Sequence, residues 1–344
     1  MSERRNNMPK PILELKELRT YFYTERGRVT AIDGISFNVN ENEILGVVGE
    51  SGCGKSATAQ SILKLYDEKE AVQYEGEINF DDKNLLTLTE NGMQKIRGND
   101  ISMIFQDPMS ALDPVYTVGD QIVETILLHQ KVSKKEAYQK AIEMLKMTGI
   151  PSPEKRINEY PHQLSGGMRQ RILIAIALIC QPKLLIADEP TTALDVTIQA
   201  QILDLIMQMN KEMGMGIIFI THDLGVVSEI CTRVVVMYLG QIVEEADTKS
   251  LFSNPLHPYT KGLIKSIPQL EGDRSQKLFT IEGMVPSLNN VPKGCRFAPR
   301  CQYADELCRN QAPELKQYSG VQKVRCWHYE KIAEIKEGEY VNTN

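Results

Sequence analysis

The sequence predicts an α/β fold built on a parallel sheet, and three short apolar runs are the evidence for it. Residues 44–48, 184–187 and 217–220 are continuously apolar, which is typical of short strands buried on both faces. Glycine or polar residues follow each run at once. Because the carboxyl ends of parallel strands meet at one edge of a sheet, we expect the chemistry of the chain there.

The elements before and between these strands are also visible in the sequence. Alternation at residues 35–40 predicts a half-buried strand of an antiparallel N-terminal sheet, and residues 49–54 form a glycine-rich loop that leads into a helix. Residues 107–163 are polar and helical in pattern with prolines at both ends, which predicts an inserted helical subdomain. Residues 168–180 predict a further helix.

Composition excludes several classes of protein. The 344 residues are 42% hydrophobic and 24% charged, with a formal net charge of −6, which argues against a disordered or coiled-coil chain and against a basic nucleic-acid footprint. The longest apolar run, residues 172–180, is far shorter than the about 20 residues of a membrane helix, and the N-terminus lacks the apolar part of a signal peptide. We therefore expect a cytosolic chain.

The glycine-rich loop has the pattern G-x-x-x-x-G-K-S in the required place between a strand and a helix. Its glycines allow backbone N–H groups to surround phosphate oxygens, Lys55 can reach the β and γ phosphates, and Ser56 can bind Mg²⁺. A chance glycine-rich turn is the alternative, which this context disfavours. The predicted nucleotide-binding residues are Gly49, Ser51, Gly52, Cys53, Gly54, Lys55, Ser56 and Ala57.

Two adjacent carboxylates follow the strand at 184–187. Hydrolysis of a nucleoside triphosphate needs one carboxylate in the metal shell and another to polarise the attacking water. We predict that Asp188 is the metal partner and Glu189 the general base. Acids that merely cap a strand are the alternative, and this is improbable beside a phosphate-binding loop.

The segment Leu164-Ser165-Gly166-Gly167-Met168-Arg169-Gln170 resembles the signature of ABC-transporter ATPases, and it directly precedes the carboxylate-bearing strand as in that family. The resemblance covers about residues 13–330 and implies the ABC-type P-loop fold with ATP and Mg²⁺. In the family, the signature of one subunit closes on the γ-phosphate held by another. The residues that would contact the partner's ATP are Ser165, Gly166, Gly167 and Met168.

Other family landmarks occur in the expected order. Gln106 resembles the Q-loop glutamine that senses the metal and the water, so the implied Mg²⁺ ligands are Ser56, Gln106 and Asp188. Ala193-Leu194-Asp195 resembles the D-loop, and His222 resembles the switch histidine at the γ-phosphate. An aromatic residue ahead of the first sheet stacks on adenine in this family. Phe22 aligns best, with Tyr21 and Tyr23 as alternatives.

Three features are similar to the oligopeptide/dipeptide importer branch: Met168, residues 107–114 and residues 254–260. This resemblance implies an ATPase subunit that couples hydrolysis to peptide import through two separate membrane permease subunits. The chain would be peripheral on the cytoplasmic face of the membrane and would dock at a groove by the Q-loop and helical subdomain. A second related ATPase, or an identical chain, would complete the dimer, with an external binding protein acting indirectly. Nickel or another small solute is the alternative substrate.

Two other functions fit the sequence less well. A soluble ABC ATPase acting on nucleic acid or ribosomes is disfavoured, because only 57 residues, without sustained heptads, separate Gln106 from Leu164 and the chain carries one cassette. A degenerate regulatory cassette is disfavoured because the catalytic residue types are intact. These are Lys55, Asp188, Glu189 and His222.

Four of the seven cysteines gather in the last fifth of the chain: Cys295, Cys301, Cys308 and Cys326. In a reducing compartment, such a cluster favours a metal site over disulfides. The spacing lacks the paired knuckles of zinc ribbons, so it favours a [4Fe–4S] cluster over Zn²⁺, and the importer resemblance implies the same.

We expect an ATPase domain at residues 10–250, with its helical subdomain at about 107–165, and a C-terminal extension at 251–335. Residues 1–9 and 336–344 are expected to be flexible tails. The extension is predicted to be a separate, loop-rich appendage that contains the cysteine cluster and lies far from the phosphate loop.

Overall fold

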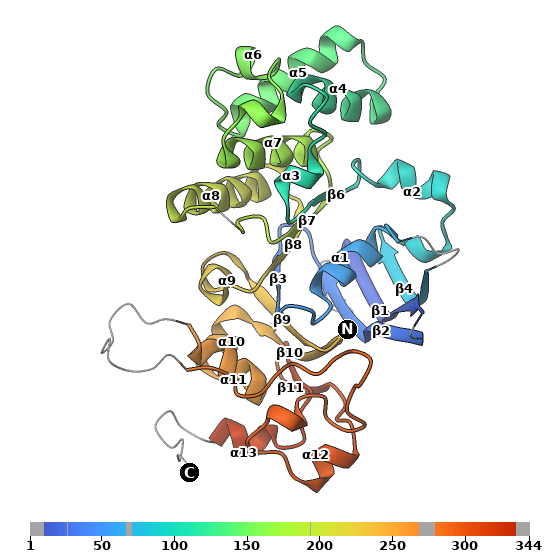
Figure 1. Ribbon diagram of the computed structural model, residues 1–344, viewed down its shortest axis with the longest axis vertical. Helices are drawn as coiled ribbons and strands as arrows, with labels where there is room; N and C mark the ends of the chain where they lie inside the picture. Colours follow the sequence, from blue (N-terminus) through green and yellow to red (C-terminus); the bar gives the residue numbers. More distant parts are fainter. Residues whose placement is uncertain (1–9, 26, 67–70, 193, 268–278, 335–344) are drawn as a thin grey trace, which may run out of the picture.

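The computed structural model describes residues 10–25, 27–66, 71–192, 194–267 and 279–334. The predicted tails at 1–9 and 336–344 lie outside the described residues. The molecule is elongated, with the inserted helices at one end, two sheets in the middle and the cysteine-bearing region at the other end (Figure 1). In the described part of the chain, no helix is long and apolar enough to cross a membrane.

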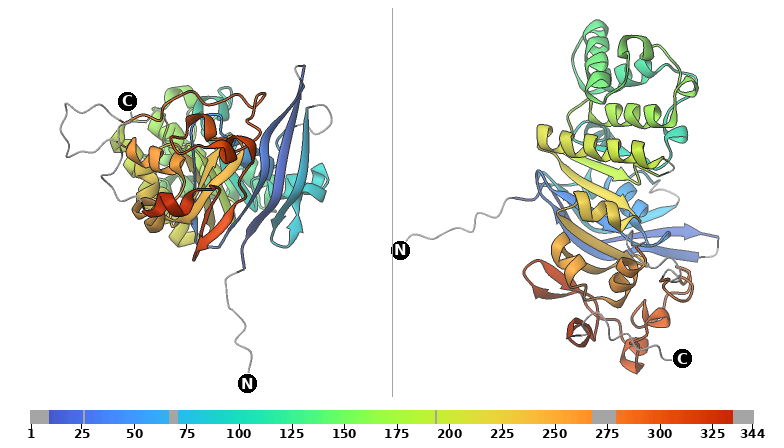
Figure 2. Two further views of the ribbon diagram at one scale, coloured as in Figure 1. Left: turned by 90° about the horizontal axis from the view of Figure 1, so that it is seen from below. Right: turned by 90° about the vertical axis from the view of Figure 1, so that its left-hand side faces the viewer.

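The predicted N-terminal antiparallel sheet is confirmed. Its strand order is β2 (Gly27–Val39), β1 (Leu13–Thr24), β4 (Val72–Phe80), β5 (Lys83–Asn84). In the last part of β2, the buried apolar residues Ile35, Phe37 and Val39 alternate with half-buried polar residues, so the sheet turns one face inward. The sheet lies to one side of the central sheet (Figure 2). The 3₁₀ turn η1 (Leu85–Thr87) and helix α2 (Glu90–Ile96) follow it.

The central sheet contains the three strands predicted from the apolar runs. Strands β6 (Ile101–Ile104), β7 (Leu184–Asp188), β8 (Gly216–Thr221), β3 (Ile44–Val48) and β9 (Arg233–Tyr238) are parallel neighbours in this order. Every residue of β3, β7 and β8 is buried. Alternate side chains enter two apolar cores, one on each face, which explains why these strands are continuously apolar.

Four helices directly precede or follow the central strands whose carboxyl ends are polar. Helix α1 (Lys55–Ile62) follows the phosphate loop, α7 (Gly166–Leu178) precedes β7, α8 (Val196–Met213) follows it, and α9 (Leu224–Ile230) follows β8. The predicted insertion is helical and, in the described part of the chain, includes five elements. They are α3 (Pro108–Ala111), α4 (Val118–His129), α5 (Lys134–Met147), α6 (Pro153–Arg156) and η2 (Pro161–Gln163).

The C-terminal region is attached more closely than the sequence predicts. It contains α10 (Thr248–Ser253), α11 (Pro258–Lys265), η3 (Ala298–Arg300), α12 (Glu306–Asn310), β11 (Lys316–Ser319), β12 (Gln322–Val324) and α13 (Tyr329–Glu334). Strand β12 pairs with β10 (Gln241–Asp247), which is itself antiparallel to β9, so β11 and β12 extend the central sheet. The expectation of a separate appendage is therefore wrong.

A buried carboxylate joins this extension to the sheet. Glu244 on β10 is fully buried and accepts hydrogen bonds from the backbone N–H groups of Leu256 and His257, both at 2.8 Å. The side-chain amide of Gln322 on β12 donates to the same carboxylate at 3.2 Å. Three donors from two segments satisfy one buried carboxylate, which holds α11 and β12 against the central sheet.

Candidate nucleotide-binding and hydrolysis site

The phosphate loop is preformed around Lys55. Gly49, Gly52 and Gly54 have φ angles of 153°, 78° and 105°, which favour glycine. A Cβ on Gly49 would lie 2.3 Å from the carbonyl oxygen of Met237, so that position has no room for a side chain. The Lys55 ammonium group is buried and donates to the carbonyl oxygens of Gly49 (2.7 Å) and Glu50 (3.2 Å).

These features fit an anion. Besides these two carbonyl oxygens, the ammonium group acts on the carboxylates of the site, since the charge of Lys55 lowers the pKa of both Asp188 and Glu189. The loop leads into the N-terminus of α1, whose N-cap residue is Gly54. A cationic side chain and a helix N-terminus together are suited to the phosphates of a nucleotide.

Ser56 and Asp188 meet beside the loop. The Ser56 hydroxyl donates to Asp188 Oδ1 at 3.1 Å, and Asp188 is only 2% exposed. Burial raises the pKa of Asp188, and the neighbouring charge of Glu189 raises it further, while the Ser56 hydrogen bond opposes both. A hydroxyl and a buried carboxylate are oxygen ligands of the type that Mg²⁺ binds, and the cation would compensate the buried charge.

Three side chains from different parts of the chain converge on Glu189. Gln106 Nε2 donates to Oε2 at 3.1 Å, the Thr192 hydroxyl donates to the same oxygen at 2.9 Å, and His222 Nδ1 lies 3.3 Å from Oε1. Glu189 itself has a positive φ of 48°, and its N–H donates to the carbonyl oxygen of Ile220 at the end of β8. This backbone turn directs Asp188 and Glu189 to separate partners.

The surroundings of Glu189 keep it ionised. Burial pushes its pKa upward, but the hydrogen bonds from Thr192 and His222 outweigh this effect and hold the pKa below its usual range. The His222 side chain is 64% exposed, whereas that of Glu189 is 13% exposed. An ionised carboxylate at the end of a buried strand can accept a proton from water, as a general base must.

The predicted Mg²⁺ ligands are divided between two groups. Ser56 contacts Asp188, whereas the amide of Gln106 donates to Glu189.

Thr192 was missed by the sequence analysis. Its position three residues after Glu189, immediately beyond a strand end, is the signal that could have indicated it.

The signature residues stand at the start of α7, a helix that contacts α3, α4 and α5 of the insertion. Ser165 is the N-cap of α7 and accepts a hydrogen bond from the N–H of Met168, and both Ser165 and Gly166 are exposed. A Cβ on Gly167 would lie 2.9 Å from Ile198 on α8, so close packing requires glycine there. Asp195 caps α8, while Ala193 lies outside the described residues. The signature helix N-terminus is therefore free to contact an anion from outside the chain.

The three candidate adenine-stacking residues have different surroundings. Tyr21 is buried beneath the guanidinium of Arg28 and bonded to Glu75, and the hydroxyl of Tyr23 bonds to Gln73. Phe22 is half-buried and makes an edge contact with Tyr66, just beyond α1, with ring centroids 4.8 Å apart. Of the three rings, Phe22 is on the α1 side of the strand.

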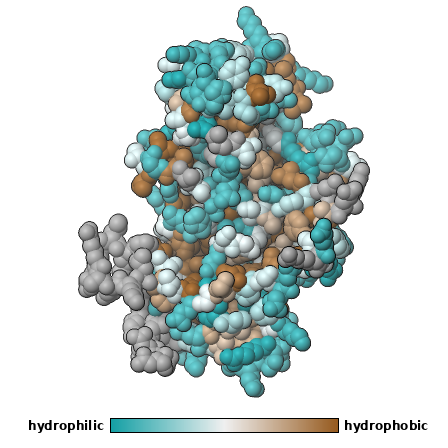
Figure 3. Space-filling model, viewed as in Figure 1, coloured by the Kyte–Doolittle hydropathy of each residue, from teal (hydrophilic) through white to brown (hydrophobic). Residues whose placement is uncertain are grey.

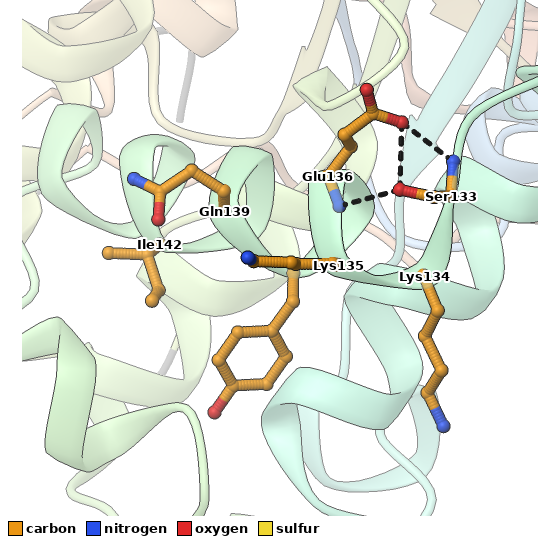
Figure 4. A pocket seen from close by; sticks show the side chains of 7 residues that line it. Ser133, Lys134, Lys135, Glu136, Gln139 and Ile142 are labelled. Carbon is orange, nitrogen blue, oxygen red and sulfur yellow. Dashed lines mark hydrogen bonds between the residues drawn. The ribbon is translucent and has the colours of Figure 1, made fainter.

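The helical insertion carries exposed apolar residues and two hollows on its surface. Val115, Tyr116 and Leu128 are 71%, 55% and 72% exposed, and hydrophobic residues appear among hydrophilic ones on this part of the molecule (Figure 3). One hollow lies along the start of α5, where Ser133 and Glu136 form a capping box and Lys134 extends to the side (Figure 4). Another hollow lies beside α4 and contains Leu127 and Leu128.

The four C-terminal cysteines come together. Cys295, Cys301, Cys308 and Cys326 line one small enclosed pocket with His257, Phe297 and His328, and all four are free thiols. Burial raises the pKa of Cys301 to about 11 and of Cys326 to about 12, and nearby cysteines add to this effect. Among the described residues, Asp305, Cys308 and His328 form the one group of three or more candidate ligand atoms within 4.8 Å of one another, so no three of these sulfurs are that close.

The cysteine region also contacts the phosphate loop, which overturns the expectation that the two are far apart. Arg300, directly before Cys301, forms an ion pair with Glu50, the second residue of the loop. Tyr259 on α11 accepts a hydrogen bond from the N–H of the same residue. Nothing in the local pattern of the sequence indicates these contacts, because the partners are more than two hundred positions apart.

Comparison with known proteins finds a transporter family model for the N-terminal part of the chain and another for the C-terminal part. Residues 32–192 match the family model described as ABC transporter, and residues 243–308 match that of the oligopeptide/dipeptide transporter C-terminal region. The oligopeptide transport ATP-binding protein AppD of Bacillus subtilis is 51% identical over 93% of this chain and 97% of that protein. The dipeptide transport ATP-binding protein DppD of Haemophilus influenzae is 48% identical over 92% and 94%.

Solved structures agree in fold. The dimeric ATP-binding cassette MJ0796 in a post-hydrolysis state bound to ADP and Pi superimposes with a TM-score of 0.62 at 28% identity, over 69% of this chain and 98% of that one. The structure of cbiO1 from Clostridium perfringens, part of the transporter complex cbiONQ, gives 0.60 at 31% identity, over 71% and 91%. The predicted ABC-type nucleotide-binding fold is thereby confirmed.

Proposed function

Because this chain belongs to the ATP-binding proteins of the oligopeptide/dipeptide ABC transporters, we propose that it is the ATP-hydrolysing subunit of a peptide importer. The observation that carries the proposal is the convergence of Gln106, Thr192 and His222 on the carboxylate of Glu189, beside Lys55 and the Ser56–Asp188 pair. A phosphate site, a metal site and an ionised base thus occur together.

Each residue then has a role in hydrolysis. The loop N–H groups and Lys55 bind the phosphates. Ser56 and Asp188 would hold Mg²⁺, which would supply positive charge for the phosphates. Glu189 accepts the proton of the attacking water, oriented by Gln106 and His222. Phe22 contacts adenine. Its half-buried ring is less engaged by other groups than those of Tyr21 and Tyr23.

Hydrolysis requires a second ATPase chain. Ser165 and Gly166 at the N-terminus of α7 are exposed, so they would bind the γ-phosphate of a partner. Asp195, which caps the neighbouring helix, would lie at the same junction. The partner is a second related ATPase or an identical chain, and ATP bound between the two holds them closed.

The helical insertion provides the docking surface for two membrane permease subunits. Its exposed apolar residues and adjacent hollows support this role. The chain then acts as a peripheral subunit on the cytoplasmic face of the membrane, and an external binding protein delivers the substrate. We divide it at about residue 250, with the ATPase unit at 10–250 and the C-terminal extension at 251–335.

We also propose that the extension holds a [4Fe–4S] cluster through Cys295, Cys301, Cys308 and Cys326. The four thiols share one enclosed pocket, and Zn–S bonds of about 2.3 Å would need sulfurs only about 3.8 Å apart, closer than any three of them lie. The cluster would supply folding energy to a region of short elements. Zn²⁺ is the alternative. Iron and acid-labile sulfide in equal proportion after anaerobic purification would support the cluster, and stoichiometric zinc without iron would contradict it.

The function is tested by uptake in cells that lack the chain. Wild-type protein should restore uptake of a labelled peptide, and Lys55→Met should not, because the phosphate charge loses its cation. The same cells are tested for nickel uptake. Restored nickel uptake without peptide uptake would replace the substrate class, and failure to recover permease subunits with the purified chain would contradict the transport role.

A further inference from the structure

The C-terminal region holds one residue of the phosphate loop by its side chain and by its backbone. Arg300 donates from Nη1 to Glu50 Oε2 at 2.6 Å and from Nη2 to Oε1 at 3.0 Å, which is a bidentate pair. The N–H of Glu50 donates to the hydroxyl of Tyr259 at 2.7 Å. Glu50 is thereby attached to elements that follow it by more than two hundred residues.

The Arg300 guanidinium is itself fixed. Its side chain is 3% exposed, and it also donates to the carbonyl oxygens of Glu282 (3.0 Å) and Ile281 (3.3 Å). The guanidinium also lies over the rings of Tyr238 and Phe297, and Cζ is 5.9 Å from the centroid of each ring. A buried guanidinium with this many partners can orient a carboxylate far better than an exposed lysine could.

Glu50 is in turn part of the structure that holds Lys55. Its carbonyl oxygen accepts from Lys55 Nζ at 3.2 Å and from the N–H of Cys53 at 3.2 Å. A displaced Glu50 would therefore displace the groups that bind phosphate. Its carboxylate, if it lost Arg300, would also place an uncompensated negative charge beside the triphosphate, where the charges repel.

A second arginine contacts residues beside the loop. Arg296, directly after Cys295, bonds to the carbonyl oxygen of Leu239 and to Asp33. The adjacent Gly240 donates its N–H to the carbonyl oxygen of Cys53 at 2.8 Å. The segment between the first two cysteines of the pocket thus contacts the surroundings of the phosphate loop at two points.

We propose that Arg300 is a positioning residue for ATP, and that the segment 295–301 couples the state of the cysteine pocket to the affinity of the phosphate loop. Arg300 orients Glu50 and neutralises its charge. This inference rests on the proposed function at the phosphate loop but not on which metal the cysteines bind. If the cysteines lose their bound group and the segment moves, the loop loses both supports and ATP affinity falls.

The test measures the dissociation constant of Mg-ATP for the full chain, with kcat and KM of hydrolysis. Arg300→Met should raise the dissociation constant and KM by roughly tenfold or more, as expected for a lost charge-assisted pair, and change kcat little. Arg300→Lys should recover part of the loss. The matched control is Arg309→Met, an exposed arginine beside Cys308 that should bind ATP like the wild type.

A double variant separates neutralisation from general damage. Glu50→Gln added to Arg300→Met removes the uncompensated charge, so affinity should recover by several-fold. Equal losses in the single and double variants, or wild-type affinity in a folded Arg300→Met protein, would overturn the role of Arg300. Cys301→Ser should also weaken ATP binding, and wild-type affinity in that variant would overturn the coupling. A wild-type chain that binds no ATP would instead contradict the proposed function.

Discussion

Replacing the carboxylate of Glu189 by an amide is the sharpest test of the hydrolysis site. Glu189→Gln preserves the shape of the side chain, and its Oε2 position can still accept from Gln106 and Thr192 while His222 turns its acceptor nitrogen to the new amide. The variant should therefore fold and bind ATP as before. It loses the group that accepts the proton of water.

The expected magnitude follows from that loss. A positioned general base contributes about 10²- to 10⁴-fold to a reaction rate, so kcat for ATP hydrolysis should fall by that factor. The dissociation constant of ATP should stay within about twofold, because Lys55 and the loop are untouched. The assay is phosphate release at saturating ATP, with the natural ATPase partner present if one is required, and size-exclusion chromatography with ATP should show a trapped dimer.

Thr192→Val is the matched control, since it removes one hydrogen bond to Glu189 and leaves the carboxylate. A lost hydrogen bond to a charged group costs about 1.5–3 kcal/mol, so the loss in kcat should be no greater than roughly 10- to 150-fold. Burial would then raise the pKa of Glu189 with less opposition, so the acid limb of the pH–rate profile should move to higher pH. Wild-type hydrolysis by Glu189→Gln would refute the assignment of the base, and an unshifted acid limb would refute the role of Thr192.

Three further predictions follow from particular contacts. Cys53 is 1% exposed, and burial raises the pKa of its thiol. Maleimide labelling, measured by mass spectrometry, should therefore be slow at neutral pH, should accelerate as the pH rises and should be slowed by ATP. Fast labelling that ATP does not affect would contradict the placement of this loop. A Cβ on Gly294 would lie 2.3 Å from the carbonyl oxygen of Cys308, which accepts from the N–H of Cys295. Gly294→Ala should therefore destabilise the cysteine region by about 1–3 kcal/mol and lower its content of the proposed cluster. A wild-type metal content and protease pattern would count against the arrangement of the pocket. Phe22→Ala should weaken ATP binding by roughly fivefold or more, as the loss of one stacked base would, whereas Tyr23→Ala should leave ATP binding unchanged. Fluorescence titration with ATP measures both variants. A larger loss of affinity in Tyr23→Ala than in Phe22→Ala would show that Tyr23 is the stacking residue.

Much of the site could be predicted because its parts are local. The phosphate loop, the Asp188-Glu189 pair and the signature each occupy a short stretch whose residue types serve one chemical purpose, and the strands beside them are recognisable from continuous apolar runs. His222 could be predicted because it ends such a run, and the structure brings it to Glu189. The spacing of the four cysteines indicated a shared metal site, and they do line one pocket.

Other contacts could not be predicted, because no periodic pattern in the sequence indicates which distant segments come into contact. The sequence by itself determined the α/β class, the two sheets and the residues at the strand ends, since burial on both faces and glycine-dependent backbone angles constrain short stretches directly. Only the tertiary structure decided that β12 joins β10, that Gln106 and Thr192 donate to the same oxygen of Glu189, and that Arg300 neutralises Glu50. These contacts depend on long-range packing, because the stabilising free energy comes from pairing polar groups that are far apart in the sequence.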